Sequence, residues 1–201
     1  TSGDTGGAVA AGFYGLKNIE VVILYPKGKV SQLQEKQLTT WGKNIKAIEV
    51  KGDFDDCQRM VKQAFLDPIL NEKLNLSSAN SINIARLIPQ SFYYFEAVKQ
   101  FKKNTKINFC VPSGNFGNLT AGLLAKRMGV IIAATNENKV VPDYLESGLF
   151  TPTQAVPTIS NAMDIGNPSN FTRIMDLYGS TWNKIRNDIK GYSFTDKETI
   201  H

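Results

Sequence analysis

Short runs of β-branched residues alternate along the chain with amphipathic segments. Strands are predicted over residues 19–25 and 45–50. Between them, Ser31 and Gln34 have the Ser-x-x-Gln spacing of a capping box, which predicts a helix that Gly42 closes. Strands that alternate with helices are typical of parallel sheets with helices on their faces. The pattern therefore predicts an α/β fold.

Two helices are predicted in the next part of the chain. The first is capped by Asp53, and its sheet-facing side chains at helical spacing are Phe54, Cys57, Val61, Phe65 and Leu66. The second runs from Ser81 to about residue 101 and contains Pro89, which must kink it or mark its first turns.

A strand, a glycine turn and a helix then follow one another. We expect the strand over residues 107–112, the turn over residues 113–118 and the helix over residues 119–128. Another strand is predicted over 130–135. The remainder is predicted as loop and helix, with residues 151–168 the least regular part.

This order predicts two lobes, each built on a parallel sheet with helices beside it. We place the smaller α/β lobe at residues 1–88 and part of a larger α/β lobe, incomplete at both ends, at 89–201. The chain begins at Thr1 inside a glycine-rich motif and stops at His201 in a new helical pattern, so we expect it to be a piece of a longer protein.

Composition narrows the functional classes. With 42% hydrophobic residues among 201, the chain can bury a core, and it has no apolar run of about 18 residues that would cross a membrane. The net charge is +5, but the Lys and Arg residues are scattered along the chain with acidic residues among them. A nucleic-acid partner and a membrane partner are therefore not expected.

Cysteine and histidine usage excludes further chemistry. Cys57 and Cys110 fall in a helix and an apolar strand, where we expect them to be buried free thiols, as in a reducing cytoplasm. The single histidine is His201. No zinc ligand set or Ser/His/Asp triad can be formed from these residues, so no metal site is expected.

The first candidate site lies at the start of the chain. Hydroxyls, glycines and backbone N–H groups gather before a helical run at residues 8–14, which makes an anion site at a helix N-terminus. Its members are Thr1, Ser2, Gly3, Asp4 and Thr5. A capped helix start without any ligand explains the same residues equally well.

The second candidate site is the turn at residues 113–118. Gly114 and Gly117, after a buried strand, aim several amides at one point before a helix, where a phosphate fits. The turn matches neither the P-loop nor the Gly-x-Gly-x-x-Gly pattern. A tight strand-to-helix connection is the alternative.

The third candidate site combines Asn80, Ser81 and Arg86 near a helix start. Ser81 and Arg86 together suit a second phosphate, with Arg86 as the bidentate charge. A helix N-cap beside a solvated arginine is the more common arrangement. Residues 161–171 are dense in turn formers, and we interpret them as a structural turn.

Six motifs in order resemble the threonine synthases, a family of pyridoxal-phosphate enzymes. They lie at residues 1–6, 25–31, 54–57, 78–83, 111–118 and 161–170. The resemblance covers essentially the whole chain. It implies a fold type II pyridoxal-phosphate enzyme and a carbon–oxygen lyase that converts O-phosphohomoserine and water to threonine and phosphate.

The resemblance also assigns roles to the candidate residues. The cofactor phosphate is expected against Gly114, Asn115, Phe116, Gly117 and Asn118. Residues Thr1 to Thr5 are expected to hold the substrate carboxylate and border the cofactor ring. The substrate phosphate is expected at Asn80, Ser81 and Arg86.

Two features depart from the family pattern. The Phe-Lys-Asp motif of the Schiff-base lysine does not occur here and is expected upstream, so we expect no catalytic lysine within these residues and no activity from them alone. The segment 126–133 also passes from helix to strand with a shorter loop than the family has.

Two other functions remain open. One is another pyridoxal-phosphate enzyme of the same fold, such as a relative of cysteine synthase or threonine dehydratase, which needs no second phosphate pocket. The other is a non-catalytic phosphate-binding module derived from the fold.

Overall fold

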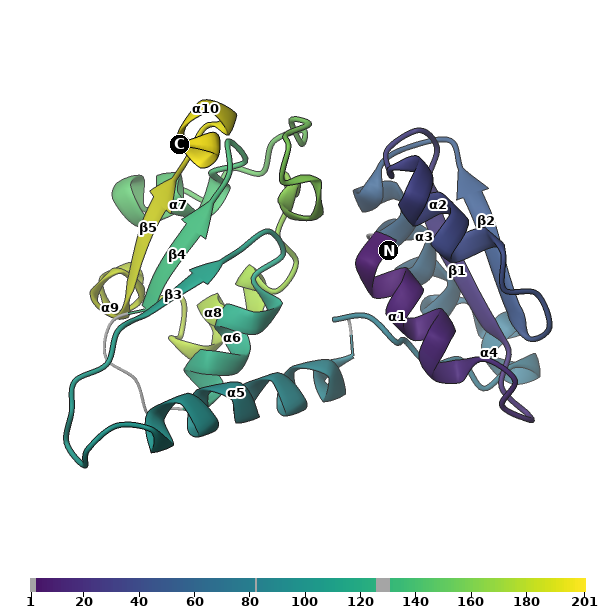
Figure 1. Ribbon diagram of the computed structural model, residues 1–201, viewed down its shortest axis with the longest axis horizontal. Coiled ribbons are helices and arrows are strands. Elements are labelled where there is room, and N and C mark those ends of the chain that lie inside the picture. The colour runs from purple at the N-terminus through teal and green to yellow at the C-terminus, as the bar shows by residue number, and fades with distance from the viewer. Residues whose placement is uncertain (1–2, 82, 126–130) are drawn as a thin grey trace. The chain divides into compact units, whose positions relative to one another are not determined.

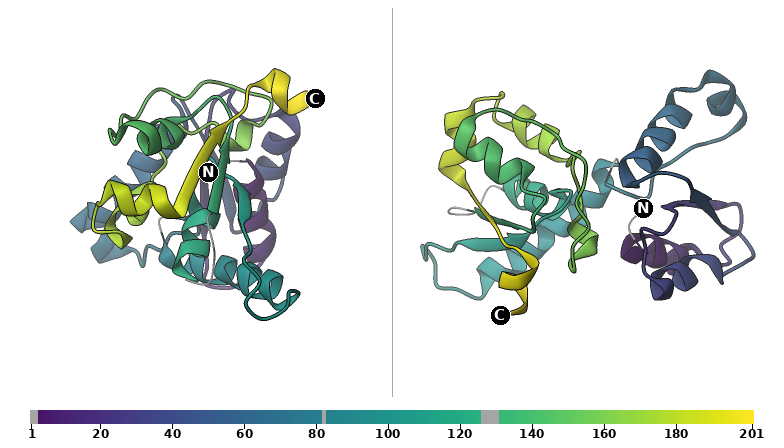
Figure 2. Two further views of the ribbon diagram at one scale, coloured as in Figure 1. Left: turned by 90° about the vertical axis from the view of Figure 1, so that its left-hand side faces the viewer. Right: turned by 90° about the horizontal axis from the view of Figure 1, so that it is seen from above.

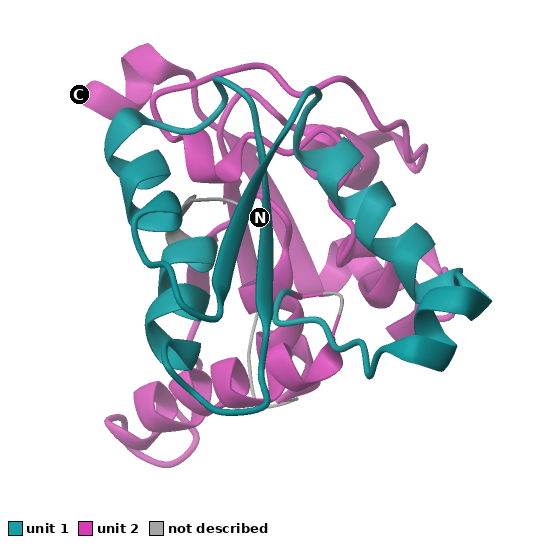
Figure 3. Cartoon of the chain, turned by 90° about the vertical axis from the view of Figure 1, so that its right-hand side faces the viewer, with its two compact units in different colours: residues 1–80 teal, residues 81–201 magenta. Residues whose placement is uncertain are grey.

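A computed structural model describes residues 3–81, 83–125 and 131–201 (Figure 1). The chain divides into two compact units, Thr1–Asn80 and Ser81–His201 (Figure 3). This division falls before Ser81, earlier than the lobe boundary expected after residue 88. The assignment of the chain to a smaller lobe and part of a larger one stays a prediction.

The first unit is a parallel two-stranded sheet with helices. Strands β1 and β2 pair from Val21 opposite Ile45 to Pro26 opposite Val50. Its elements are α1 (Gly3–Phe13), β1 (Val21–Pro26), α2 (Gln32–Thr39), β2 (Ile45–Val50), α3 (Phe54–Leu66) and α4 (Pro68–Lys73). Its core consists of Ala10, Ile23, Tyr25, Leu38 and Ile45.

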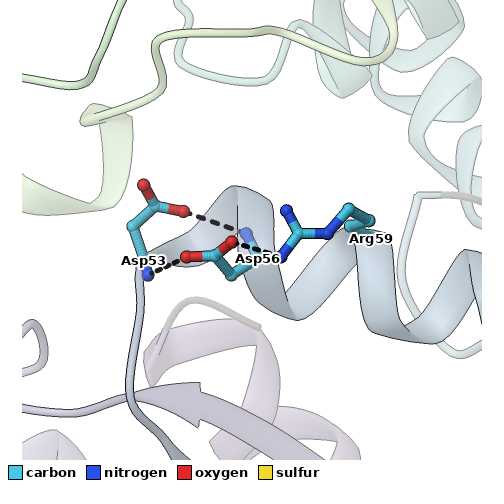
Figure 4. Close-up of polar contacts among 3 residues, drawn as sticks. All are labelled: Asp53, Asp56 and Arg59. Carbon is cyan, nitrogen blue, oxygen red and sulfur yellow. Dashed lines mark hydrogen bonds and ion pairs between the residues drawn. The ribbon is translucent and has the colours of Figure 1, made fainter.

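Both predicted capping residues of this unit are confirmed. The Ser31 hydroxyl accepts from the Gln34 N–H at 3.2 Å, and the Ser31 N–H donates to the Gln34 side chain at 3.1 Å. Asp53 and Asp56 make the same reciprocal pair at 2.9 Å each, and Arg59 donates to Asp56 (Figure 4). These side chains satisfy amides that the helix leaves unpaired at its first turn.

Two predictions for this unit are wrong. Helix α1 begins at Gly3 rather than Ala8, so Gly6 and Gly7 are helical. Packing of Ala10 in the core outweighs the poor helix propensity of glycine. Leu66, expected to face the sheet, is 81% exposed because it is the last residue of α3.

The second unit contains a three-stranded parallel sheet in the order β3-β4-β5. Its elements are the 3-10 helix η1 (Ile84–Arg86), α5 (Leu87–Lys99), β3 (Phe109–Pro112), α6 (Gly117–Leu124), β4 (Ile131–Thr135), α7 (Val140–Ser147), η2 (Asn161–Met163), α8 (Phe171–Leu177), α9 (Trp182–Asp188), β5 (Ile189–Ser193) and α10 (Asp196–Ile200). Figure 2 shows β5, in yellow, leading into α10.

The core of this unit lies around the sheet. Ile131 and Ile189 of the two paired strands are fully buried, as are Ile174 and Phe171 of α8. The Phe171 ring lies 5.1 Å from that of Tyr144 in α7. Helices α7 and α8 are therefore joined by one aromatic cluster.

The sequence predicted only part of the second unit. It did not predict β5, and it placed the long helix too early, since α5 begins at Leu87 with Pro89 in its first turn. Cys110 is exposed, contrary to expectation, whereas Cys57 is buried. Only alternate side chains of β3 are covered, and Val111 is the buried one.

The remaining boundaries differ slightly from expectation. Strand β3 begins at Phe109, and α6 begins at Gly117. The short loop expected within residues 126–133 lies mostly outside the described residues. Among the helices that the structure describes, none has the length and apolar character needed to cross a bilayer.

Candidate functional site

The glycine turn (residues 113–118) links β3 to α6. Ser113 extends the strand pairing, because its N–H donates to the Ala134 carbonyl at 2.8 Å. The first residue outside α6 is Phe116, and no side chain caps this helix. The N–H groups in the first turn of α6 therefore have no capping side chain as a partner. Such N–H groups at a helix N-terminus form an anion-binding site.

Phe116, not Gly117, has the left-handed backbone of this turn. Its φ is 61°, whereas Gly117 is not among the residues with positive φ. Burial of the Phe116 ring against Phe171, with centroids 5.9 Å apart, supports this backbone. A Cβ at Gly117 would lie 3.6 Å from side-chain atoms of Leu87 and Asn170, so ordinary packing would accept it.

Position 114 requires glycine, because another backbone segment lies too close for a side chain. A Cβ there would lie 2.6 Å from the Cα of Met163, the last residue of η2. The loop before α8 therefore supports the glycine turn directly. The turn formers at residues 161–171 predicted a structural turn, but nothing in the sequence indicated this contact.

Ser81 accepts hydrogen bonds from two side-chain amides, one of which belongs to the glycine turn. Its hydroxyl oxygen accepts from Asn115 Nδ2 at 3.2 Å and from Asn170 Nδ2 at 2.9 Å. The side-chain oxygen Oδ1 of Asn115 in turn accepts from the Ser169 N–H at 2.7 Å. Two accepted bonds occupy both lone pairs of the Ser81 oxygen, so this hydroxyl can interact further only as a donor.

Ser81 is not a helix cap. The N-cap of η1 is Asn83, whose side chain accepts from the Ala85 N–H at 3.0 Å. The cap interpretation of Ser81 is therefore wrong, and its hydroxyl serves the turn instead. Asn170, which is 1% exposed, is a member of this site that the sequence did not predict.

A second set of hydrogen bonds connects the turn to α5. Tyr94 donates to Asn118 Oδ1 at 2.6 Å, and Asn118 Nδ2 donates to Gln90 Oε1 at 3.3 Å. Gln90 Nε2 donates to the Arg86 carbonyl at 2.9 Å. Burial raises the pKa of Tyr94 to about 12, so its hydroxyl remains a donor at neutral pH.

The structure thus brings Ser81, the glycine turn and the backbone of Arg86 into one hydrogen-bonded group in the second unit. Asn80 belongs to the first unit, where its N–H donates to Ser78 Oγ at 3.3 Å. Thr5 lies in the first turn of α1. Thr1 and Ser2 are outside the described residues, as is the side chain of Asp4.

Metal chemistry finds no support in the part of the chain that the structure describes. No group of three or more His, Cys, Asp and Glu side chains lies close enough there to hold a metal ion. The glycine turn offers N–H donors instead, which bind anions.

Comparison with known proteins supports the sequence resemblance. A family profile described as "Pyridoxal-phosphate dependent enzyme" matches residues 1–201. The threonine synthase of Buchnera aphidicola subsp. Acyrthosiphon pisum is 56% identical over 184 residues, covering 89% of this chain and 43% of that protein. The chain thus spans less than half the length of the curated relatives it matches.

Two solved structures are similar in fold. The crystal structure of threonine synthase from Escherichia coli matches with a TM-score of 0.89 and 50% identity, over 98% of this chain and 47% of that one. The structure of pyridoxal-phosphate-bound threonine synthase from Brucella melitensis matches with a TM-score of 0.81 and 37% identity, over 99% of this chain and 49% of that one.

Proposed function

Because the chain belongs to the family of pyridoxal-phosphate-dependent enzymes, we propose that it is part of a cytoplasmic threonine synthase. The proposed reaction converts O-phosphohomoserine and water to threonine and phosphate. The observation that carries the proposal is the glycine turn, whose uncapped amides and hydrogen-bonded Ser81 provide N–H and O–H donors in one place. The similarity to threonine synthases supports the choice of reaction.

The residues of the turn fit the phosphate of the cofactor. Amides at the start of α6 supply donors and the positive end of the helix dipole, and Gly114 and Gly117 keep side chains away from the backbone. Gly114, Asn115, Phe116, Gly117 and Asn118 would hold the phosphate. When bound, pyridoxal phosphate supplies an electron sink for negative charge that develops beside the substrate amino group.

The substrate phosphate is assigned to Asn80, Ser81 and Arg86. Ser81 is suited to this role because both of its lone pairs are engaged, which leaves the hydroxyl as a donor toward an anionic oxygen. Arg86 adds a guanidinium that pairs bidentately with phosphate. Binding the leaving phosphate at fixed donors stabilises the charge that it gains as the carbon–oxygen bond breaks.

The other end of the substrate is assigned to the start of the chain. Thr1, Ser2, Gly3, Asp4 and Thr5 would bind the substrate carboxylate with hydroxyls and amides. The Schiff-base lysine is not assigned to any residue of this chain.

An activity assay on the complete gene product tests the proposed reaction. We expect release of inorganic phosphate together with threonine from O-phosphohomoserine. Turnover of O-acetylserine with sulfide, or deamination of threonine, in place of that reaction would favour a cysteine synthase or threonine dehydratase relative. Phosphate binding without any turnover would favour the non-catalytic module.

A cofactor titration tests the assignment of the glycine turn. Gly117→Val in the complete gene product should weaken pyridoxal-phosphate binding at least tenfold, because a Cβ at Gly117 already lies 3.6 Å from Leu87 and Asn170 and the two methyl groups beyond it would displace the side chains that hold the turn. Gly12→Val is the matched control, since a Cβ at Gly12 meets no atom within 4 Å. Equal affinities for the two variants would contradict the assignment.

A further inference from the structure

A cluster of polar side chains, two of them buried and two half-buried, lies beyond the carboxyl end of β4. Asn136 and Asn138 follow this strand directly and are 3% and 8% exposed. They meet Thr158 and Asp164 from the irregular loop that precedes α8. We call these four residues the Asp164 cluster.

Asp164 is the common acceptor of this cluster. Its Oδ1 accepts from Thr158 Oγ1 at 2.7 Å, from Asn136 Nδ2 at 2.8 Å and from Asn138 Nδ2 at 3.3 Å. Its Oδ2 accepts from the Thr158 N–H at 2.9 Å. Four donors on one carboxylate fix both oxygens, and bonds to a charged acceptor are stronger than neutral ones.

Two sets of contacts hold the loop that precedes α8, one from the Asp164 cluster and one within the loop. Asn138 exchanges two hydrogen bonds with the backbone of Val156, at 2.9 Å and 2.7 Å. Within the loop, the Thr153 N–H donates to the Gly166 carbonyl at 3.0 Å. The two backbones lie so close there that a Cβ at Gly166 would collide with the Thr153 carbonyl. The loop is thus closed on itself and held to the end of β4.

Met163 transmits this placement to the glycine turn. It immediately precedes Asp164, and the Asp164 N–H donates to the Asn161 carbonyl at 3.1 Å. Its Cα lies where a Cβ on Gly114 would be only 2.6 Å away. Any displacement of Asp164 therefore moves the backbone on which Gly114 rests.

We propose that Asp164 is a positioning residue for cofactor binding. It sets the glycine turn through Met163 and does not itself touch the phosphate. The proposal rests on the function proposed above, because it assumes that the cofactor phosphate binds at this turn.

Phosphorus-31 NMR of the bound cofactor, combined with a cofactor titration of the complete gene product, tests this role. Asp164→Asn keeps the shape but places an N–H₂ group where an oxygen now accepts donors, so at least one charge-assisted bond is lost. We expect the dissociation constant to rise about tenfold and the phosphate resonance to shift. Asp143→Asn is the matched control, because Asp143 lies exposed on α7 in a surface ion pair with Lys139.

A second pair of variants separates positioning from loss of folding. Thr158→Val removes the hydroxyl that donates to Asp164 and should weaken cofactor binding. Thr158→Ser retains the hydroxyl and should bind the cofactor as the wild type does. An unchanged resonance and affinity in Asp164→Asn, with a lower unfolding midpoint alone, would show that the cluster only stabilises the fold and would overturn the proposal.

The Gly117→Val variant distinguishes the two proposals. If Gly117→Val weakens cofactor binding and Asp164→Asn does not, the positioning role fails while the site assignment stands. If neither variant changes binding, the assignment of the glycine turn fails, and the role of Asp164 fails with it.

Discussion

Tyr94 illustrates how one buried side chain couples a helix to the proposed site. Its hydroxyl donates to both the side-chain and the main-chain oxygen of Asn118, at 2.6 Å and 3.0 Å. Asn118 belongs to the first turn of α6, so the position of this turn depends on α5. Only the protonated phenol can donate, which makes the contact sensitive to alkali.

A pH titration of stability checks this contact. Burial raises the Tyr94 pKa from 10.0 to about 12, so its contribution is fully present below pH 10 and is lost as the pH rises toward 12. The free energy of unfolding should therefore fall more steeply between pH 10 and 12 in the wild type than in Tyr94→Phe. Tyr192→Phe, at an exposed tyrosine, is the control. Parallel curves for wild type and Tyr94→Phe would refute the prediction.

Arg86 is the residue on which substrate choice is predicted to depend. Hydrogen bonds to charged groups contribute roughly 1.5–3 kcal/mol, so Arg86→Ala should lower kcat/KM for O-phosphohomoserine at least tenfold. The kcat/KM of Arg86→Lys should lie between those of the wild type and Arg86→Ala, since lysine supplies a charge without the planar guanidinium. Arg186→Ala removes a guanidinium that lies 4.7 Å from the Trp182 ring and should leave kcat/KM unchanged. An unaltered value in Arg86→Ala would remove Arg86 from the site.

Helix starts that carry a capping box are predicted well from the sequence. Ser31 and Asp53 cap α2 and α3 as predicted, because a capping box is encoded within four consecutive residues. The start of α1 was missed, since it depends on packing in the core and not on local sequence. Strand β5 was missed for a similar reason: it is defined by pairing with β4, far away along the chain.

The proposed site shows the same limit. The glycine turn could be predicted because its glycines and the strand before it are contiguous. The contacts that hold it could not, since Ser81 is separated by 34 residues from Asn115 and by 89 from Asn170. The left-handed backbone of Phe116 could not be predicted either, because backbone propensity favours glycine at such a position and only the aromatic packing supports phenylalanine there.

The cap of α3 gives a prediction at this scale. Asp53→Ala removes the acceptor for the Asp56 N–H, and loss of an N-cap costs about 1 kcal/mol of unfolding free energy. Asp53→Asn retains a side-chain acceptor and should remain close to the wild type. Chemical denaturation followed by circular dichroism measures both. Equal destabilisation by the two changes would indicate that charge, and not the cap, is what matters.

At the scale of the whole molecule, each unit has its own sheet and core. In the second unit Phe171 joins three other rings, those of Phe116, Tyr144 and Phe150. One of these belongs to the glycine turn. The proposed site is therefore built directly on the core of this unit.

Phe171→Ala tests how much this cluster contributes. Removing a fully buried phenylalanine leaves a cavity and costs about 3–5 kcal/mol. Phe194→Ala, at a side chain that is 45% exposed, is the control and should cost far less. Urea unfolding of both variants gives the comparison. Similar losses would mean that the site relaxes around the cavity without dependence on the aromatic cluster.

The parallel register of the two sheets has a consequence for the order in which the chain acquires structure during synthesis. In the first unit Val21 pairs with Ile45, so the second strand leaves the ribosome soon after the first. In the second unit Ile131 pairs with Phe109 and with Ile189. Strand β4 must therefore wait for the synthesis of β5, much later along the chain, before its second neighbour is made, and its edge is exposed in the meantime. The first unit can begin to fold while the ribosome is still translating the second one.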